Sequence, residues 1–231
     1  MAGSVDVDMP RELVIERLTG FVTSQQRPHP LRVAVDGPDA AGKTTLADEL
    51  AAALLEHGRP VLRISADDFH RPAEERLRRG SLSAEGYFLD AFDYPALRRL
   101  VLDPLGPDGD RRYQRAVTAA RLTPEPERAP ANAVLVLDGV FLLRDELRSA
   151  WDLTVHVTVT PAESLRRALV RDVELFDSEA TVRERYTHRY LPGQDLYRAA
   201  AHPERTADVV IDNEDVSHPR LLSWRTGRTT P

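Results

Sequence analysis

Short apolar runs alternate with polar stretches along the chain, and their lengths suit buried strands. The clearest runs are residues 31–36, 60–64, 133–140, 153–160 and 208–212. Runs of this length that are rich in valine and lack a polar face are typical of strands covered on both sides of a sheet. The pattern therefore predicts a parallel sheet with helices packed on it.

The segments between these runs carry apolar residues at helical spacing. Helices are expected over residues 10–24, 44–56 and 94–102, and from residue 161 past residue 171. Residues 107–133 hold many Pro, Arg and Glu residues and predict an irregular surface excursion. Strands that are each followed by a helix or loop predict an α/β fold, a five-stranded parallel sheet with helices on both faces.

No internal repeat or domain boundary interrupts this pattern. Residues 1–231 are expected to form a single domain, with the core at residues 31–213 and a C-terminal tail at 214–231. The tail holds a short apolar stretch at residues 221–224, and its packing stays open at this point.

Composition narrows the class of protein. The chain has 231 residues, of which 42% are hydrophobic, and this suits one folded domain. Its net charge of -6 disfavours a nucleic-acid partner, and no apolar stretch is long enough for a membrane span. Residues 1–8 are acidic and lack the apolar core of a signal peptide, and the chain has no cysteine. A cytoplasmic protein without disulfides is expected.

A glycine-rich octet, residues 37–44, lies between the first apolar run and the helix that follows it. It fits the phosphate-binding pattern G-x-x-x-x-G-K-[ST]. A loop between a strand and a helix directs backbone N–H groups and the helix N-terminus at one anion. The octet and the next residue therefore predict a nucleotide site made by Gly37, Pro38, Asp39, Ala40, Ala41, Gly42, Lys43, Thr44 and Thr45.

Lys43 is the only lysine in the chain, because the rest of its 31 lysine and arginine residues are arginine. An ammonium is a compact point charge, whereas the planar guanidinium is larger and needs a forked acceptor. A chain that keeps lysine only here is expected to need an ammonium among phosphates. The alternative is a surface lysine that happens to follow a glycine, and the strand–loop–helix context disfavours it.

Carboxylates follow several of the predicted strands, at the edge of the sheet where ligands bind in open α/β folds. Asp138 closes the strongest apolar run and is expected to position Mg²⁺ together with the Thr44 hydroxyl. Asp67 is the candidate general base that faces the acceptor hydroxyl, with Asp68 as the competing residue. Asp36 also lies at a strand end. Taken singly, each could instead be a loop aspartate that caps a turn.

Four segments resemble the uridine kinase and phosphoribulokinase group. Residues 64–72 are similar to its D-[ST]-F-Y-R segment, and residues 136–143 to its F-E-G-I strand. Residues 167–172 resemble its R-x-x-x-R-D helix, and residues 189–213 its closing P-x-x-x-x-Y…A-D-x-[IV]-[IV] pattern. The resemblance implies a P-loop kinase fold that uses ATP and Mg²⁺, with a small helical lid at about residues 172–193.

The resemblance also implies roles for charged residues. Asp67 corresponds to the catalytic aspartate of the group. Arg167 and Arg171 lie one helical turn apart, where the group uses arginines to hold donor phosphates; the alternative is a pair of solvated helix arginines. The predicted catalytic residues are thus Lys43, Asp67 and Arg171. Further lid candidates are Arg183, Arg185 and Arg189.

The acceptor side departs from the pattern of pyrimidine nucleoside kinases, Y-D-F-x-x-H-x-R. This chain keeps Tyr113, but Gln114, Arg115 and Thr118 replace the Asp, Phe and His of the pattern. The aromatic and imidazole contacts to a pyrimidine base are therefore missing, which weakens uridine as the acceptor. Arg115 is expected to meet an anionic or carbonyl group instead.

Three further residues are candidates for the acceptor site. His70 stands at the Tyr position of the group's segment and is expected to line the site. Asp90 or Asp93 lies in a segment that resembles the one holding ribose hydroxyls, and the alternative is an N-cap on the following helix. The other histidines show no metal-ligand spacing.

Taken together, the residues predict a kinase that transfers the γ-phosphoryl group of ATP to a hydroxyl of a nucleoside-like small molecule. A kinase for a non-nucleoside metabolite and a nucleotide-binding NTPase without a small-molecule acceptor are the alternatives. A guanine signature N-K-x-D does not occur, because Lys43 is the only lysine. Preference for ATP over GTP and the oligomeric state stay open.

Overall fold

The computed structural model describes residues 3–117 and 125–225. Its main sheet has seven strands in the order β1-β9-β8-β7-β2-β6-β3. The strands are β1 (Gly3–Asp8), β2 (Leu31–Asp36), β3 (Val61–Ser65), β6 (Val134–Gly139), β7 (Leu153–Thr158), β8 (Val209–Asp212) and β9 (Arg220–Trp224). The predicted parallel arrangement is confirmed, because β8, β7, β2, β6 and β3 pair in parallel.

Two strands extend the predicted sheet. β9 pairs antiparallel with β8, and β1 pairs antiparallel with β9. The apolar stretch in the C-terminal tail thus forms a strand between β8 and β1, and β1 is the edge strand. β1 is acidic in sequence and short, so its strand comes from pairing with β9 rather than from an apolar pattern of its own.

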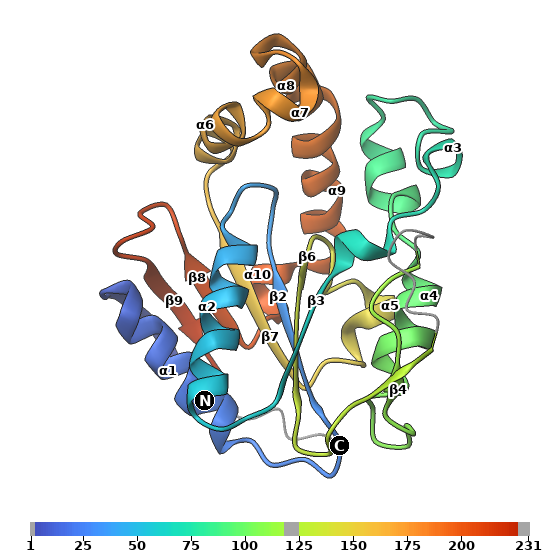
Figure 1. Ribbon diagram of the computed structural model, residues 1–231. Coiled ribbons are helices and arrows are strands. Elements are labelled where there is room, and N and C mark those ends of the chain that lie inside the picture. Colours follow the sequence, from blue (N-terminus) through green and yellow to red (C-terminus); the bar gives the residue numbers. More distant parts are fainter. Residues whose placement is uncertain (1–2, 118–124, 226–231) are drawn as a thin grey trace.

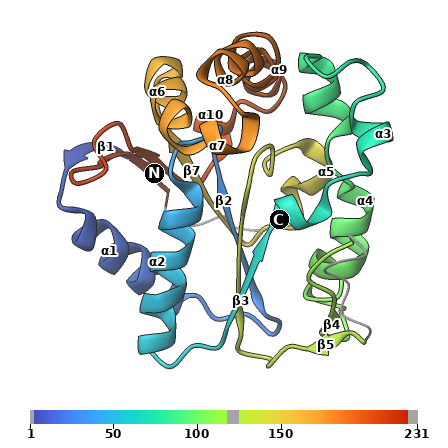
Figure 2. The ribbon, with the colours of Figure 1, turned by 45° about the horizontal axis from the view of Figure 1, so that its top comes forward.

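Helices cover both faces of the sheet, as Figures 1 and 2 show. On one face lie α1 (Arg11–Ser24) and α2 (Lys43–Glu56). On the other lie α4 (Tyr94–Leu97), its π-helical continuation η3 (Arg98–Leu102), and α5 (Asp145–Arg148). The expected helix at residues 94–102 is therefore present, with a wider turn in its second half.

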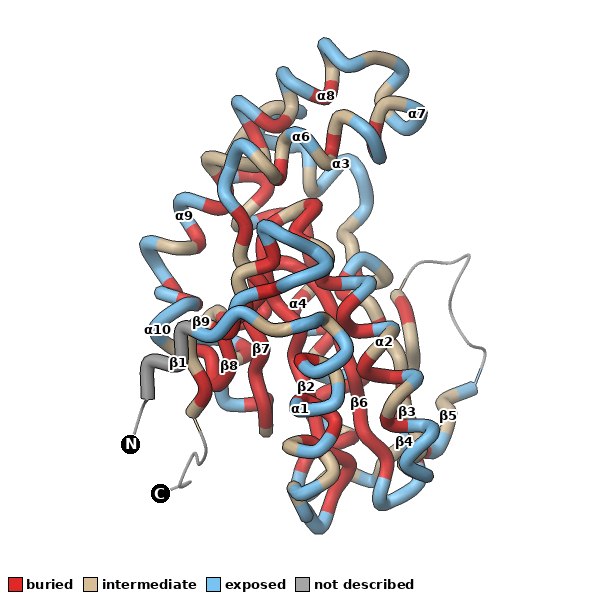
Figure 3. Tube along the Cα trace, turned by 90° about the vertical axis from the view of Figure 1, so that its left-hand side faces the viewer, coloured by how far each residue is buried: buried red, intermediate tan, exposed pale blue. Residues whose placement is uncertain are grey.

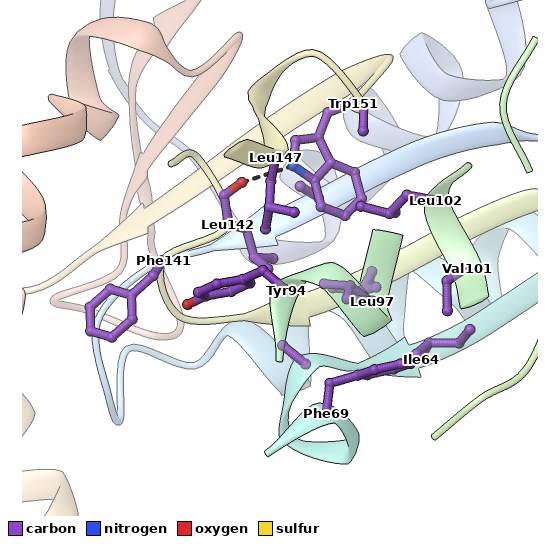
Figure 4. Packing of buried hydrophobic residues seen from close by; sticks show 14 of the residues in the cluster. Ile64, Phe69, Tyr94, Leu97, Val101, Leu102, Phe141, Leu142, Leu147 and Trp151 are labelled. Atoms are coloured by element: carbon purple, nitrogen blue, oxygen red, sulfur yellow. Dashed lines mark hydrogen bonds between the residues drawn. The ribbon is translucent and has the colours of Figure 1, made fainter. Parts of the chain in front are cut away.

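Alternate side chains of the central strands enter two different cores, which explains their unbroken apolar sequences. Val33 and Val35 of β2 pack with Leu50 of α2, whereas Ala34 belongs to the core on the opposite face. Figure 3 shows the buried strands between exposed helix surfaces. In the core that contains Ala34 (Figure 4), the Trp151 Nε1–H donates to the Leu142 carbonyl at 2.8 Å.

A group of helices lies beyond the carboxyl ends of the strands, at the top of Figure 1. It consists of α6 (Pro161–Arg171), α7 (Val173–Phe176), α8 (Glu179–Arg185), the π-helical turn η4 (Tyr186–Tyr190) and α9 (Leu191–Ala201), which is followed by α10 (Pro203–Thr206). Ala40 of the glycine-rich loop packs with Ala168, Val182 and Tyr186 of this group. The helices predicted to form a lid thus contact the loop directly.

The remaining segments are short. They are η1 (Ala66–Phe69), α3 (Ala73–Arg76), the π-helical turn η2 (Gly86–Asp90), and the two-stranded ribbon of β4 (Arg112–Tyr113) and β5 (Glu127–Arg128). The ribbon lies within the predicted irregular excursion. In the described part of the chain, every helix is too short or too polar to cross a bilayer.

Candidate active site

The glycine-rich loop joins β2 to α2 and turns through left-handed backbone conformations. Ala40 has a φ of 56° and Gly42 a φ of 89°, a region that disfavours residues with a Cβ. A Cβ on Gly37 would meet the Val157 carbonyl oxygen at 2.2 Å, so glycine is required where the loop leaves the sheet. These constraints account for the glycines of the motif.

Three side chains donate hydrogen bonds to carbonyl groups of the loop, and two of them come from distant elements. The Lys43 Nζ, only 8% exposed, donates to the Pro38 carbonyl at 2.7 Å across the loop. Ser164 of α6 donates to the Asp39 carbonyl at 2.7 Å, and Asn213 donates to the Ala41 carbonyl, also at 2.7 Å. The loop is therefore held in shape before any ligand binds. Sequence reasoning missed Ser164 and Asn213, because their contacts span more than a hundred residues.

Thr44 and Asp138, the two predicted magnesium residues, lie together. The Thr44 hydroxyl donates to Asp138 Oδ2 at 2.6 Å, and Asp138 is 2% exposed. The described residues include no cluster of three or more His, Cys, Asp or Glu side chains suited to a metal. One hydroxyl and one carboxylate nevertheless fit Mg²⁺, which accepts oxygen ligands and keeps phosphates and waters in its shell when nucleotide is bound.

Arg63 of β3 is an unpredicted member of this site. Its Nη1 lies 2.7 Å from Asp138 Oδ1, and its Nε lies 2.7 Å from Asp48. The guanidinium fixes the Asp138 carboxylate and offsets part of its negative charge. No motif signals this role, since arginine at the centre of a short strand is identified only once β3 is paired with β6.

Asp67 lies close to the Asp138 end of the sheet. Ser65 and Asp138 are register partners on β3 and β6, and η1 begins at the next residue. A Cβ on Gly139 would meet the Ala66 Cβ at 2.4 Å, so glycine allows η1 to pack tightly against β6. Asp67 is exposed at the start of η1, with its N–H bonded to Ser65 Oγ at 3.3 Å.

Asp68, the competing candidate base, is half-buried. Its carbonyl accepts a hydrogen bond from the Val117 N–H at 3.1 Å. Asp67 is the more accessible carboxylate of the pair, which favours it for contact with a bound acceptor.

The two predicted donor-side arginines of α6 have carboxylate partners. Arg167 Nε lies 2.6 Å from Glu163, and its Nη2 donates to the Asn213 carbonyl at 2.7 Å. Arg171 is 59% exposed and its Nε lies 2.6 Å from Asp172; this pairing raises its pKa above the usual value. Arg167 therefore contacts Asn213, whose side chain donates to the Ala41 carbonyl. Arg171 is the last residue of α6.

The structure brings two predicted acceptor residues to the end of η1: His70 follows it directly, and the Asp93 N–H donates to the Phe69 carbonyl at 2.8 Å. His70 forms an antiparallel bridge with Phe92, and the two rings lie 4.4 Å apart. Asp93 accepts the Ala96 N–H at 2.9 Å as the N-cap of α4, which is the alternative allowed by its sequence.

Asp90 is buried and already paired with two arginines. Arg78 Nη2 and Arg79 Nε lie 2.6 and 2.7 Å from its carboxylate oxygens. The hydrogen bond from Arg78 is the main cause of the lowered pKa of Asp90. Contact between Asp90 and an acceptor stays a prediction. Both carboxylate oxygens are already paired with arginines, so an acceptor would have to share them.

Tyr113 and Arg115 are also engaged within the protein. Tyr113 is buried and donates to Glu127 Oε2 at 2.7 Å, while Arg115 Nε lies 2.8 Å from Glu127 Oε1. The hydrogen bond from Arg115 lowers the pKa of Glu127, and burial raises that of Tyr113. Arg115 also donates to the Arg63 carbonyl at 3.1 Å. Thr118 lies outside the described residues.

Asp36, at the end of β2, serves the fold. It is fully buried and accepts hydrogen bonds from the Leu142 N–H at 3.0 Å and from the Tyr197 hydroxyl at 2.8 Å. His156 Nδ1 also lies 2.8 Å from this carboxylate. With its oxygens occupied in this way, Asp36 ties β7 and α9 to the strand that carries the phosphate loop.

Kinases are among the known proteins that this chain resembles in sequence. No protein-family model matches the chain. A uridine kinase of Lactobacillus helveticus is 25% identical over 190 residues, which cover 79% of this chain and 86% of that protein. Uridine-cytidine kinase B of Dictyostelium discoideum is 27% identical over 185 residues, which cover 79% of this chain and 74% of that protein.

Solved structures show the same fold. A Bacillus stearothermophilus protein described as a possible uridine kinase matches with a TM-score of 0.65 at 21% identity, covering 86% of this chain and 98% of that one. A candidate fructose transport system kinase from Silicibacter sp. TM1040 gives a TM-score of 0.66 at 21% identity, covering 84% and 96%. D-glycerate 3-kinase from Cryptococcus neoformans gives 0.57 at 16% identity, covering 86% and 94%.

These likenesses confirm the P-loop kinase fold and the resemblance inferred from the motifs. The names of these proteins refer to uridine and cytidine, to fructose transport and to D-glycerate. The fold they share therefore leaves the acceptor open.

Proposed function

We propose that this P-loop kinase, which resembles the uridine kinase and phosphoribulokinase group, transfers the γ-phosphoryl group of ATP to a hydroxyl of a small metabolite. A nucleoside-like compound is the first hypothesis for the acceptor, and a non-nucleoside metabolite is the second. The internal pairing of Tyr113, Arg115 and Glu127 supports the second.

The observation that carries the proposal is the meeting of Lys43, Thr44, Asp138 and Asp67 at one edge of the sheet. Thr44 hydrogen-bonds Asp138, and Asp138 is the register partner of Ser65, two residues before Asp67. A phosphate-binding loop, an oxygen site for a cation and an exposed carboxylate are thus adjacent. This is the combination that phosphoryl transfer to an alcohol requires.

In the proposed reaction, the acceptor hydroxyl oxygen forms a bond to the γ-phosphorus while the bond from that phosphorus to the β-phosphate bridging oxygen breaks. Asp67 orients the hydroxyl and accepts its proton, and ADP leaves. Lys43 and Arg171 offset the negative charge that shifts toward the leaving oxygen. Thr44 and Asp138 would hold Mg²⁺, which when bound neutralises phosphate charge.

The burial of Lys43 and the exposure of Asp67 support the separate roles proposed for them. Lys43 is nearly buried and fixed to Pro38, so its ammonium is positioned without rearrangement. Asp67 is exposed, so a hydroxyl can approach it. We also propose that the protein acts in the cytoplasm, which is the default expectation for a chain with no apolar stretch long enough to span a membrane.

The test is an assay of ADP release from ATP and Mg²⁺, with and without a panel of nucleosides, sugars and hydroxy acids. We expect release to depend on one class of acceptor. Turnover that proceeds at the same rate without any acceptor would instead identify an NTPase. GTP in place of ATP would establish the preference for the donor.

A further inference from the structure

Arginines near the acceptor side fall into two sets. Most have a carboxylate partner: Arg71 with Glu75, Arg78 and Arg79 with Asp90, Arg171 with Asp172, and Arg183 with Glu179. Among the residues that the structure describes, Arg76, Arg185 and Arg189 form no ion pair. These three residues are called the cationic cluster below.

Arg189, on η4, is the most deeply buried member of the cluster. It is 4% exposed, and within the described segments its Nη1 donates only to the carbonyls of Ser81 and Ser83, at 3.4 and 3.2 Å. Its guanidinium carbon lies 5.4 Å from the centre of the Tyr87 ring. Burial lowers its pKa, and the positive charges of Arg185 and Arg76 lower it further. Arg185 and Arg76 are therefore close enough for their charges to act on Arg189.

Arg76 and Arg185 each retain an unused donor. The Nε atoms of both are buried and have no hydrogen-bond partner in the described part of the chain. Arg185 lies over the Phe176 ring at 4.5 Å, and Arg76 ends α3. A buried N–H without a partner is costly, and three uncompensated positive charges near one another add repulsion. An anion would satisfy the donors and the charges together.

The cluster adjoins the acceptor side of the proposed active site. Tyr87, below Arg189, donates to Asp39 of the phosphate loop at 2.8 Å. Its pKa is raised, first by burial and then by the negative charges of Asp39 and, more weakly, Asp67. A single aromatic side chain thus lies between the phosphate loop, the candidate base and the buried arginine.

We propose that Arg76, Arg185 and Arg189 form a subsite for an anionic group, a carboxylate or a phosphate, that the acceptor carries in addition to its reacting hydroxyl. This inference rests on the proposed kinase function and deepens it. The donor phosphates have their own cradle in the braced loop with Lys43. Arginine matches the oxygens of carboxylate and phosphate by paired hydrogen bonds.

Matched acceptors separate the anionic group from the hydroxyls. ADP release is measured with ribose, ribonate and ribose 5-phosphate, with the corresponding glycerol, glycerate and glycerol 3-phosphate, and with uridine. We expect a carboxylate or phosphate member to exceed its neutral parent in kcat/KM, and the better of the two identifies the anion. Turnover restricted to neutral acceptors would overturn the inference while the kinase function stands. Acceptor-independent turnover would count against the kinase function itself.

Variants locate the effect. Arg76→Gln, outside the lid helices, should raise KM for the anionic acceptor roughly tenfold to hundredfold, as expected for a lost charged hydrogen bond. The KM for ATP should not change. Arg98→Gln is the matched control, because this arginine also lies outside the lid helices but pairs with Asp103. A rise in the KM for ATP in place of that for the acceptor would assign the cluster to the donor and refute the proposal.

A binding measurement does not depend on turnover. Inorganic phosphate is titrated into the protein saturated with Mg²⁺ and a non-hydrolysable ATP analogue, and the melting temperature is followed. Saturable stabilisation is expected in the wild type and Arg98→Gln, and its loss in Arg76→Gln. No saturable phosphate effect in the wild type, or an equal effect in all three proteins, would refute the subsite even if no acceptor is found.

Discussion

The donor and acceptor sides of the candidate site are built differently. On the donor side, residues close in sequence form the loop, and distant residues brace its carbonyl groups: Ser164 bonds Asp39, and Asn213 bonds Ala41. On the acceptor side, most of the predicted polar residues are paired with other groups of the protein. Asp90 is held by Arg78 and Arg79.

The difference shows that a site formed by a backbone motif follows from local sequence, whereas a site formed by side chains depends on the tertiary fold. The phosphate loop has a shape set by glycine conformations, so its function follows from local sequence. The acceptor side has no such motif, and its charges find partners according to the tertiary fold. We propose that its specificity depends on the cationic cluster, whose members form no ion pair among the described residues.

The largest effect is expected from Lys43→Arg. The Nζ lies 2.7 Å from the Pro38 carbonyl and the residue is nearly buried, so a guanidinium does not fit without moving the loop. We expect kcat to fall by about 10² to 10³, as for the loss of other transition-state donors. Arg59→Lys, at a half-buried position just after α2, is the control in steady-state kinetics. Near-normal turnover of Lys43→Arg would show that any cation suffices.

Asp67→Asn tests the acceptor side next. A base in a loose transition state mainly orients the nucleophile, so we expect kcat to fall by about 10²-fold, the low end for general base catalysis. ATP affinity, measured by equilibrium titration, should stay the same. Asp68→Asn is the matched control, because Asp68 is half-buried beside it, and it should do less. The reverse ranking would make Asp68 the base.

Asp93 distinguishes a structural role from substrate contact. Because its carboxylate caps α4, Asp93→Ala should lower the free energy of unfolding by about 1 kcal/mol. Asp93→Asn keeps a capping oxygen and should restore most of that stability in urea unfolding. If instead both variants raise the KM for the acceptor and neither loses stability, Asp93 reads the substrate.

A smaller effect is expected on the pH dependence of stability, through Glu163 on the donor side. The hydrogen bond from Arg166, followed by that from Arg167, lowers the pKa of Glu163 to about 2. A carboxyl with a depressed folded-state pKa stabilises the fold above its ordinary value of about 4.5, and loses this contribution as the pH falls toward about 2.

The check is the melting temperature of wild type and Glu163→Gln across that acidic range. The wild type should lose more stability than the variant as the pH falls. Because Arg166 is largely exposed, salt should shrink the difference. Parallel curves for the two proteins at low salt would show that the ion pairs contribute little.

The sequence predicted the parallel core and the phosphate loop because both depend on local patterns. The unbroken apolar runs of β2 and β6 require burial on both faces, and the order of strand, loop and helix places Lys43. The Thr44–Asp138 contact followed from the rule that strand ends meet at one edge.

Features formed by long-range pairing were not predicted. β1 becomes a strand only beside β9, and Arg63 becomes part of the site only when β3 lies beside β6. Arg115 was expected to face an acceptor, but Glu127 lies 2.8 Å from it across a ribbon that no local signal indicated. The partner of a charged side chain depends on the tertiary fold, and it cannot be predicted from a single sequence.

The most direct test of the central claim is the fate of the labelled γ-phosphorus of ATP in a reaction with the acceptor mixture. Phosphoryl transfer to an alcohol predicts that the label appears in an organic phosphate ester, that its formation requires Mg²⁺, and that Lys43→Arg abolishes most of it. Recovery of the label only as inorganic phosphate, at a rate independent of the acceptors, would contradict the assignment of this site as a small-molecule kinase.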